Sequence, residues 1–253
     1  MASFRNLLFA AFAVLWLGSS AQIDISDSSV VVPMFSVAFG YQVPAGDIAE
    51  RYGNNATIGG DFKVKTSGNW VFGVDFNYIF GEDIKNRDER LSIIRTDLGE
   101  IIDGEGVYAS WQMFERGFYS TFRVGKIFPV IGPNPNSGII FMAGPGYMQH
   151  KTRIEVEFNT APQLKGDYKR GYDKLTGGFT AAAFLGYIHM SNSKIVNFYV
   201  GLEFVQAWTQ DYREYNFNEM QYTNGQYSDN LFGLKAGWFL PLHKRAPRDF
   251  YYK

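Results

Sequence analysis

The chain has 253 residues, of which 17% are aromatic and 27 are glycine, and it contains no cysteine. Its 24 basic and 25 acidic side chains give a formal net charge of -1, which argues against a nucleic-acid-binding protein with a basic surface. An exported protein without cysteine has no disulfide framework, so its stability must come from packing or from a membrane.

The first 21 residues have the pattern of a secretory signal peptide. Arg5 supplies a positive charge, Leu7–Leu17 is apolar, and the small residues of Ser19–Ala21 precede a predicted cleavage before Gln22. The apolar run is short for a membrane-spanning helix, and no later stretch of the sequence has that length and character. Only helices and closed β-barrels satisfy all their backbone polar groups in lipid, so a membrane-embedded form of this chain requires strands.

The sequence predicts a first strand over Met34–Val43 and a second over Ala56–Lys65, joined by a loop rich in Gly and Asn. In both strands apolar residues alternate with small or polar ones, and Asp61 and Lys63 fall on the inward face of the second strand. A tight turn over Thr66–Asn69 then leads into a third strand.

This third strand, Trp70–Gly81, has the clearest pattern in the chain. Large apolar residues occupy alternate positions from Trp70 to Phe80, and small or polar residues such as Asp75 lie between them. Successive side chains of a strand point to opposite faces, so one face is apolar and aromatic. A sandwich in water could alternate in this way, but a lipid-facing strand better explains an aromatic face with a charge opposite its centre.

The middle of the chain allows two strand counts. Counting Val107–Phe114 as a separate strand gives nine, whereas single-chain bacterial barrels have even numbers, short periplasmic turns and long outer loops. We therefore take Val107–Phe114 as an outer extension that leads into a strand over Phe118–Phe128, after a long charged loop over Glu82–Asp103. The remaining predicted strands are Ile139–His150, Gly178–Met190, Ile195–Trp208 and Leu231–Leu242.

The predicted fold is all-β: an eight-stranded antiparallel transmembrane β-barrel with short periplasmic turns and long extracellular loops. The barrel occupies residues 22–242, after the signal peptide of residues 1–21 and before a periplasmic C-terminal tail of residues 243–253. Lys151–Gly177 and Thr209–Asn230 are predicted as outer loops.

Three acidic and three basic side chains fall on inward-facing positions of these strands. Eight strands enclose an interior just wide enough to be filled by side chains, and charges buried there must be paired. Glu203 and Lys235 lie mid-strand on neighbouring strands and are the first expected pair. We expect the network to plug and stiffen the barrel; the alternative is a proton path or a small polar site. Its members are Asp61, Lys63, Asp75, Arg123, Glu203 and Lys235.

Residues suited to catalysis are few. The histidines are predicted at separate places, with His150 at the outer rim, His189 at the inner end of a strand and His243 beyond the barrel. The sequence has no metal-binding histidine spacing, nucleophile elbow, P-loop or dinucleotide-binding glycine pattern. We predict no catalytic, cofactor-binding or metal-binding residues and no cofactor; an enzyme would need polar groups converging at the outer rim, for example around His150.

The outer loops and the tail carry Tyr and Arg among mixed charges, and these residue types anchor protein interfaces. The loop aromatics could equally belong to the outer membrane girdle. In the tail, consecutive aromatic residues favour docking onto a partner or the barrel base over a free tail. The partner-binding candidates are Tyr168, Arg170, Tyr172, Tyr212, Arg213, Tyr215, Arg248, Phe250, Tyr251 and Tyr252.

The last predicted strand ends in Lys235–Leu242, a polar residue followed by Gly237 and then by Leu240 and Leu242. This segment is similar to the recognition signal that the barrel-assembly machinery reads in small outer-membrane barrels of Gram-negative bacteria. Members of that group usually end in an aromatic residue there, whereas this chain continues to Lys253. The segments GKIF, NPNSG, GPGYMQHK and KRGYDKL also resemble an uncharacterised small-barrel family of the Bacteroidota.

The resemblance implies a place in the cell outer membrane and a role as accessory subunit of a machine for barrel assembly or type IX secretion. The expected function is a non-enzymatic scaffold that contacts outer-membrane lipids and binds other outer-membrane or periplasmic proteins, but no nucleic acid. The alternatives are an enzyme that modifies lipid or lipopolysaccharide, and a surface-binding adhesin.

Overall fold

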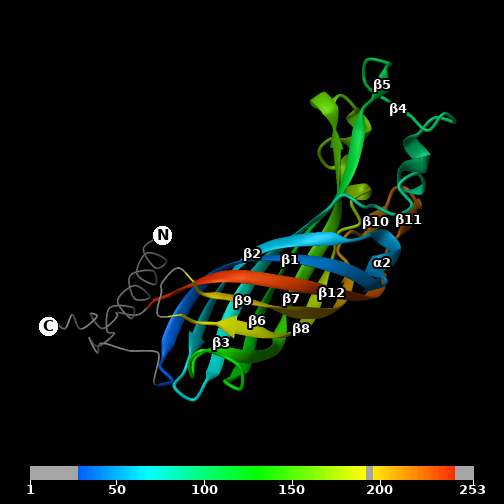
Figure 1. The fold of residues 1–253 in the computed structure, drawn as a ribbon. Coiled ribbons are helices and arrows are strands. Elements are labelled where there is room, and N and C mark those ends of the chain that lie inside the picture. Colours follow the sequence, from blue (N-terminus) through cyan, green and yellow to red (C-terminus); the bar gives the residue numbers. More distant parts are fainter. Residues whose placement is uncertain (1–27, 192–195, 243–253) are drawn as a thin grey trace, which may run out of the picture.

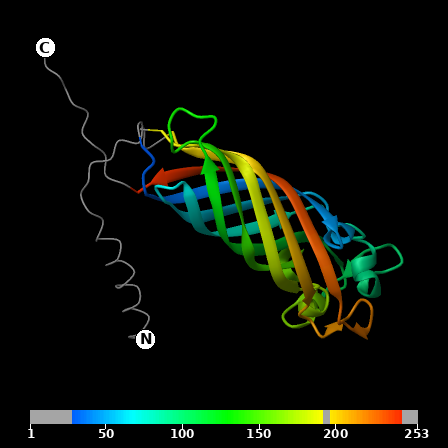
Figure 2. The same ribbon diagram turned by 90° about the horizontal axis from the view of Figure 1, so that it is seen from below.

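The computed structural model describes residues 28–191 and 196–242. Eight long strands form a closed antiparallel barrel in the order β1-β12-β9-β8-β7-β6-β3-β2 (Figure 1, Figure 2), which confirms the predicted fold. The strands are β1 (Val32–Gly46), β2 (Asn55–Lys65), β3 (Trp70–Gly81), β6 (Trp111–Phe128), β7 (Gly138–Val156), β8 (Thr176–His189), β9 (Phe198–Asp211) and β12 (Gln226–Pro241).

The remaining elements are short and lie at the end of the barrel away from the described termini (Figure 1). Two small sheets pair β4 with β5 and β10 with β11, and among the described residues no helix is long and apolar enough to cross a membrane. These elements are α2 (Ile48–Arg51), η1 (Glu89–Ile94), β4 (Ile101–Ile102), β5 (Tyr108–Ala109), η2 (Glu157–Asn159), η3 (Pro162–Leu164), η4 (Tyr168–Gly171), β10 (Tyr215–Asn216) and β11 (Gln221–Tyr222).

Strand bounds differ from the prediction mainly at this outer end. β3 has the predicted bounds, but β7 continues to Val156 in register with Trp111 of β6, where the sequence predicted a loop from Lys151 onward. The extension lacks the alternation of apolar and polar residues that marks a membrane strand. Its outward side chains, Lys151 and Arg153, are charged because the strand has left the apolar belt there. The predicted signal peptide, the predicted tail and residues 192–195 lie outside the described residues.

The outside of the barrel is an apolar belt. On β1 the outward residues are about half exposed, while Ser36 and Gln42 between them are buried in the lumen. The same alternation continues around the ring. A continuous apolar surface of this kind belongs in hydrocarbon and not in water, so the barrel is a membrane-spanning one. Belt residues include Phe35, Val37, Phe39, Ile58, Phe72, Val74, Phe76, Phe122, Phe141, Phe179, Leu185, Val200, Leu202, Phe232, Leu234 and Trp238.

The inside of the barrel is filled in layers. An apolar layer near the inner end includes Met34, Val71 and Phe239. A second apolar layer near the outer end includes Ile79, Met148 and Leu231, and it continues onto Ile48 of the short helix α2 and Tyr52, the residue that caps it. The predicted charged residues lie between these two layers along the strands.

A third apolar cluster lies outside the membrane, in a folded unit that we call the cap: residues 82–113, 153–175 and 212–225. Its buried side chains come from segments far apart in the sequence and form a small core of their own. The backbone of these segments extends beyond the outer end of the barrel (Figure 1). The buried members are Leu91, Ile101, Ala109, Met113, Ile154, Ala161, Leu164 and Tyr172.

Candidate functional site

The lumen network is centred on Arg123 of β6. Its Nε lies 2.7 Å from Asp75 Oδ2, and its Nη2 lies 2.7 Å from Glu203 Oε1. Glu203 Oε1 also receives Lys235 Nζ at 2.9 Å, the pair expected from the sequence, and Glu203 Oε2 accepts a hydrogen bond from Tyr119 at 2.7 Å. Two cations and a hydroxyl thus surround the Glu203 carboxylate.

Asp61 and Lys63 of β2 form the rest of the network. Lys63 Nζ lies 2.6 Å from Asp61 Oδ1, to which Ser36 also donates a hydrogen bond, and Tyr199 donates to Asp61 Oδ2 at 2.7 Å. The three acids and three bases named from the sequence therefore pair within the lumen. Pairing of this kind makes buried charge tolerable, because the partner of each ion takes the place of the water that the ion has lost.

Little space remains in this part of the lumen. The cavity beside Asp61, Asp75 and Arg123 has a volume of about 20 Å³, which is room for one water molecule. The network therefore lies in a filled part of the lumen, with an apolar layer on either side.

His150 is the one histidine that meets a carboxylate among the described residues. Its Nε2 lies 3.0 Å from Asp229 Oδ2 and 3.0 Å from Thr176 Oγ1, and Thr209 donates to Asp229 at 2.6 Å. Arg51 of α2 approaches the second Asp229 oxygen at 3.5 Å. The sequence did not predict this group, because its members lie far apart in the chain, on β7, β8, β9, β12 and α2.

A hydroxyl, a histidine and a carboxylate in contact suggest acyl chemistry, but burial argues against it here. His150, Thr176 and Asp229 are all 0% exposed, so a lipid substrate has no access to them. His150 lies at the outer end of the barrel, as expected, where it pairs in register with Thr176, the first residue of β8, and its side chain is buried. His189 stacks on Phe198 at the inner end, at a centroid distance of 5.2 Å, and His243 lies outside the described residues.

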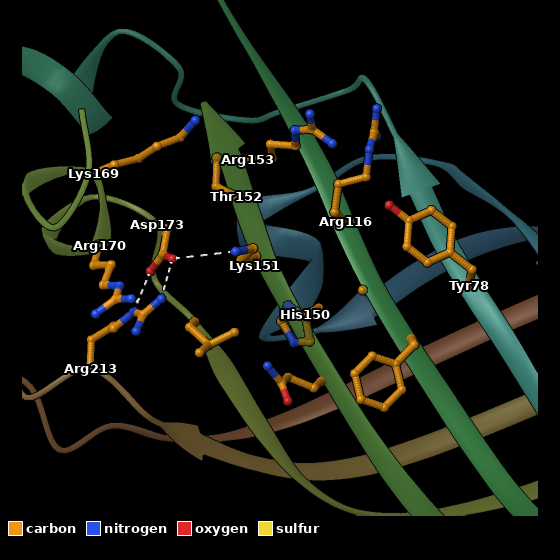
Figure 3. Close-up of a pocket in the computed structure, with 15 residues that line it drawn as sticks. Tyr78, Arg116, His150, Lys151, Thr152, Arg153, Lys169, Arg170, Asp173 and Arg213 are labelled. Carbon is orange, nitrogen blue, oxygen red and sulfur yellow. Dashed lines mark hydrogen bonds and ion pairs between the residues drawn. The ribbon is translucent and has the colours of Figure 1, made fainter. Parts of the chain in front are cut away.

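A second accessible site is a pocket of about 520 Å³ on the outer face of β6 and β7, above the belt (Figure 3). Arg116 and Phe118 of β6 and Gln149, Lys151 and Arg153 of β7 reach it from outward-facing positions of their strands. The cap segment 166–175 and the start of the loop after β9 form the opposite wall. Tyr78 and Phe118 line its membrane side, where Phe118 stacks on the belt residue Phe76 at 5.6 Å.

This pocket is strongly basic. Six cationic side chains line it, whereas Asp173 is its one lining carboxylate. Figure 3 shows Asp173 between Arg213, which binds it through two hydrogen bonds of 2.8 and 2.6 Å, and Lys151 at 3.9 Å. Glu155 and Asp167, outside the lining, pair with two other arginines. The cations are Arg116, Lys151, Arg153, Lys169, Arg170 and Arg213.

Six cations against three carboxylates give an excess of three positive charges among the described residues around the pocket. Arg116 donates to the backbone carbonyls of Gly81 and Glu115, which carry no formal charge. Burial, together with the neighbouring charges of Arg153 and Lys151, lowers the pKa of Lys169. The pocket therefore has the positive potential that concentrates anions.

The partner-binding candidates of the described part of the chain separate into three groups. Tyr168 and Arg170 are exposed on η4. Tyr212 bonds the belt residue Tyr147 through their hydroxyls at 3.1 Å, Tyr215 packs against Tyr222 in the small β10-β11 sheet, and Arg213 binds Asp173. Tyr172 is instead buried in the cap core against Phe217, so it is a packing residue. Arg248, Phe250, Tyr251 and Tyr252 lie outside the described residues.

Comparisons with known proteins find likeness in structure but not in sequence: no protein-family model and no curated protein matches this chain. Ail, the attachment invasion locus protein of Yersinia pestis, is similar with a TM-score of 0.42 and 8% identity, covering 83% of this chain and 99% of its own. For OprG of Pseudomonas aeruginosa the TM-score is 0.41 and the identity 10%, and the match covers 86% of this chain and 99% of OprG. For Neisserial surface protein A the TM-score is 0.39 and the identity 8%, and the match covers 82% of this chain and 96% of that protein. At these values we transfer no function from them.

Proposed function

We propose that this protein is an integral outer-membrane β-barrel of a Gram-negative cell that works without catalysis, as a rigid scaffold that holds its cap for binding to a protein partner. The observation that carries this proposal is that the same chain has a filled lumen and a folded cap. A filled lumen is unsuited to transport, and a cap with its own apolar core has a fixed surface to present.

The membrane and its orientation follow from general rules of such barrels. The signal-like N-terminus supports export, and closed barrels with apolar exteriors occur in the outer membrane. Both described ends lie on the side of the short turns, so that side is periplasmic and the cap is extracellular (Figure 2).

The tip of the cap offers a contact surface. Ile102 and Tyr108 face each other across the β4-β5 pair and are 46% and 59% exposed. Phe158, in a left-handed backbone conformation with a φ of 54°, is exposed in the neighbouring cap segment. Apolar and tyrosine side chains held rigidly in an otherwise polar surface are typical anchors of protein interfaces.

A test is co-purification in mild detergent followed by mass spectrometry of the bound proteins. We expect a stoichiometric envelope protein with the wild-type chain and its loss with the double variant Ile102→Ser and Tyr108→Ser. Ile131→Ser, at an exposed site in the turn between β6 and β7, is the matched control and keeps the partner. Absence of any stoichiometric partner, or equal recovery with all three proteins, contradicts the scaffold function.

Two finer assignments remain part of this proposal. An accessory role in barrel assembly or type IX secretion, in a Bacteroidota-type family, predicts that the partner is a subunit of that machine, reached through the cap or the tail of residues 243–253. An adhesin uses the same extracellular cap, so the cap supports it equally well; it predicts instead that the partner belongs to another cell or to a host surface.

A further inference from the structure

From the basic pocket between β6, β7 and the cap, we propose that this protein binds a phosphate-bearing lipid head-group of the outer leaflet. The inference rests on the membrane placement proposed above and is independent of the protein partner of the cap. It concerns the pocket of Figure 3, which the scaffold function does not use.

The position of the pocket is the first argument. Tyr78 of β3 and Phe118 of β6 pair in register at its membrane side, and the belt continues inward from them through Phe76. Aromatic side chains of this kind lie at the level of lipid head-groups. One outward-facing position further along, Phe80 of β3, Arg116 of β6 and Lys151 of β7 pair in register, so cations take the outward positions of β6 and β7 at this level. The pocket therefore opens where phosphate groups of the outer leaflet lie.

The charge arrangement is the second argument. Lys169 and Arg116 have no carboxylate partner among the residues that the structure describes, and they reach the pocket from opposite walls. Lys151 is held only loosely, at 3.9 Å from an Asp173 that Arg213 already binds through both oxygens. These three cations can thus bind an anion between them without breaking a strong ion pair.

The fixed shape of the wall is the third argument. Asp173 is buried, and its backbone carbonyl accepts a hydrogen bond from the Thr152 backbone N–H at 2.8 Å, which fastens the cap segment to β7. Arg213 joins the same carboxylate from the loop after β9. Cations held on a rigid wall lose less conformational freedom on binding than cations on a free loop.

The head-group is expected to be that of a phosphorylated glycolipid or phospholipid, with its phosphate among Lys151, Lys169 and Arg116 and its first acyl chain along Phe118 and Phe76. A free phosphate ion would share the polar contacts but gain nothing from the aromatic wall. The volume of about 520 Å³ accommodates a head-group and not a whole lipid.

The experiment is a native mass spectrometry titration of the full mature protein in detergent, with diphosphorylated lipid A, its dephosphorylated form and inorganic phosphate as separate probes. We expect the double variant Lys151→Gln and Lys169→Gln to bind diphosphorylated lipid A about tenfold more weakly, since each cation near a lipid surface contributes to binding. The single variant Arg116→Gln, on another strand, tests the same site if the double variant does not fold.

Lys126→Gln is the matched control, because Lys126 projects outward beside Trp70 at the opposite edge of the belt. It should leave the affinity unchanged. The proposal is overturned if the site variants bind as tightly as the wild type and the control, or if the dephosphorylated lipid binds equally well. It is also overturned if inorganic phosphate binds as tightly as the lipid, since the site would then be one for free anions. Failure of the cap to capture a protein leaves all these outcomes unaffected.

Discussion

In the lumen, Arg123 is buried between two carboxylates inside a wall whose outer surface is apolar, whereas in the cap Leu91 is buried beneath a surface of charged side chains. The two regions are packed in opposite senses because they meet different solvents. Hydrocarbon outside the barrel accepts apolar residues on the outward face, and the interior holds a paired ionic network between two apolar layers, while water around the cap drives apolar residues into its core. One chain thus contains both kinds of core, joined where β6 and β7 leave the membrane.

The largest expected effect is in the lumen. Arg123→Ala leaves Asp75 and Glu203 with a missing cation in a buried site, and we expect the barrel to lose about 3–5 kcal/mol of unfolding free energy. Heat-modifiable gel migration measures this as a lower unfolding temperature. Arg153→Ala, which removes an exposed partner of Glu155, is the matched control and should cost below about 1 kcal/mol. Equal effects would show that burial of the network does not matter.

A substitution in the cap core should lower the stability of the cap for the same reason as in the core of a water-soluble protein. Leu91→Ala removes a fully buried side chain and is expected to destabilise the cap by about 2–5 kcal/mol. Limited proteolysis should then cleave the cap while the heat-modifiable migration of the barrel stays unchanged. If the unfolding temperature of the barrel falls equally, the cap and the lumen form one cooperative unit, and the contrast drawn between them is wrong.

Lys235→Ala should have a smaller effect than Arg123→Ala. Glu203 keeps Arg123 and Tyr119 as partners, so we expect a loss of about 1–3 kcal/mol, the range of a charged hydrogen bond. Planar bilayer recordings should show no channel, because the apolar layers on both sides remain. Stable single-channel conductance in this variant, or in the wild type, would contradict a plugged lumen.

The smallest expected effect is a pH dependence of the cap. A hydrogen bond from Lys174 lowers the pKa of Glu219, so the pair stabilises the folded cap above the ordinary pKa of the carboxyl group, and this contribution is lost as the pH falls through the lowered value. Protease sensitivity of the cap should therefore rise modestly below about pH 4. Glu219→Gln should abolish that increment; an unchanged pH profile in this variant would assign the effect to other groups.

The difference between the two regions also explains what the sequence could predict. Alternation with a period of two separates inside from outside in any strand, so the parity of Glu203 and Lys235 was sufficient to place them inside the barrel on neighbouring strands. The same rule located the belt and the bounds of β3. It requires only that the solvent outside the barrel be apolar.

The cap has no such rule, because irregular segments have no parity. Tyr172 looks like Tyr168 in the sequence, yet one is buried in the cap core and the other is exposed. The group around His150 and the basic pocket also come from segments distant in the chain, whose meeting depends on the ring order and on the cap folding over β7. The charges of Lys151 and Arg153 at outward positions were the one local signal that the strand had left the membrane.

The most direct test uses the absence of cysteine in the chain, which allows single nitroxide labels at introduced cysteines in the protein reconstituted in bilayers. At Phe72, Val74 and Phe76, collisions with oxygen should exceed those with a water-soluble nickel chelate, whereas Thr57 and Asn77 in the lumen should be inaccessible to both. High accessibility to the nickel chelate at the first three positions would mean that water and not hydrocarbon surrounds the barrel, and at the last two it would mean an open pore.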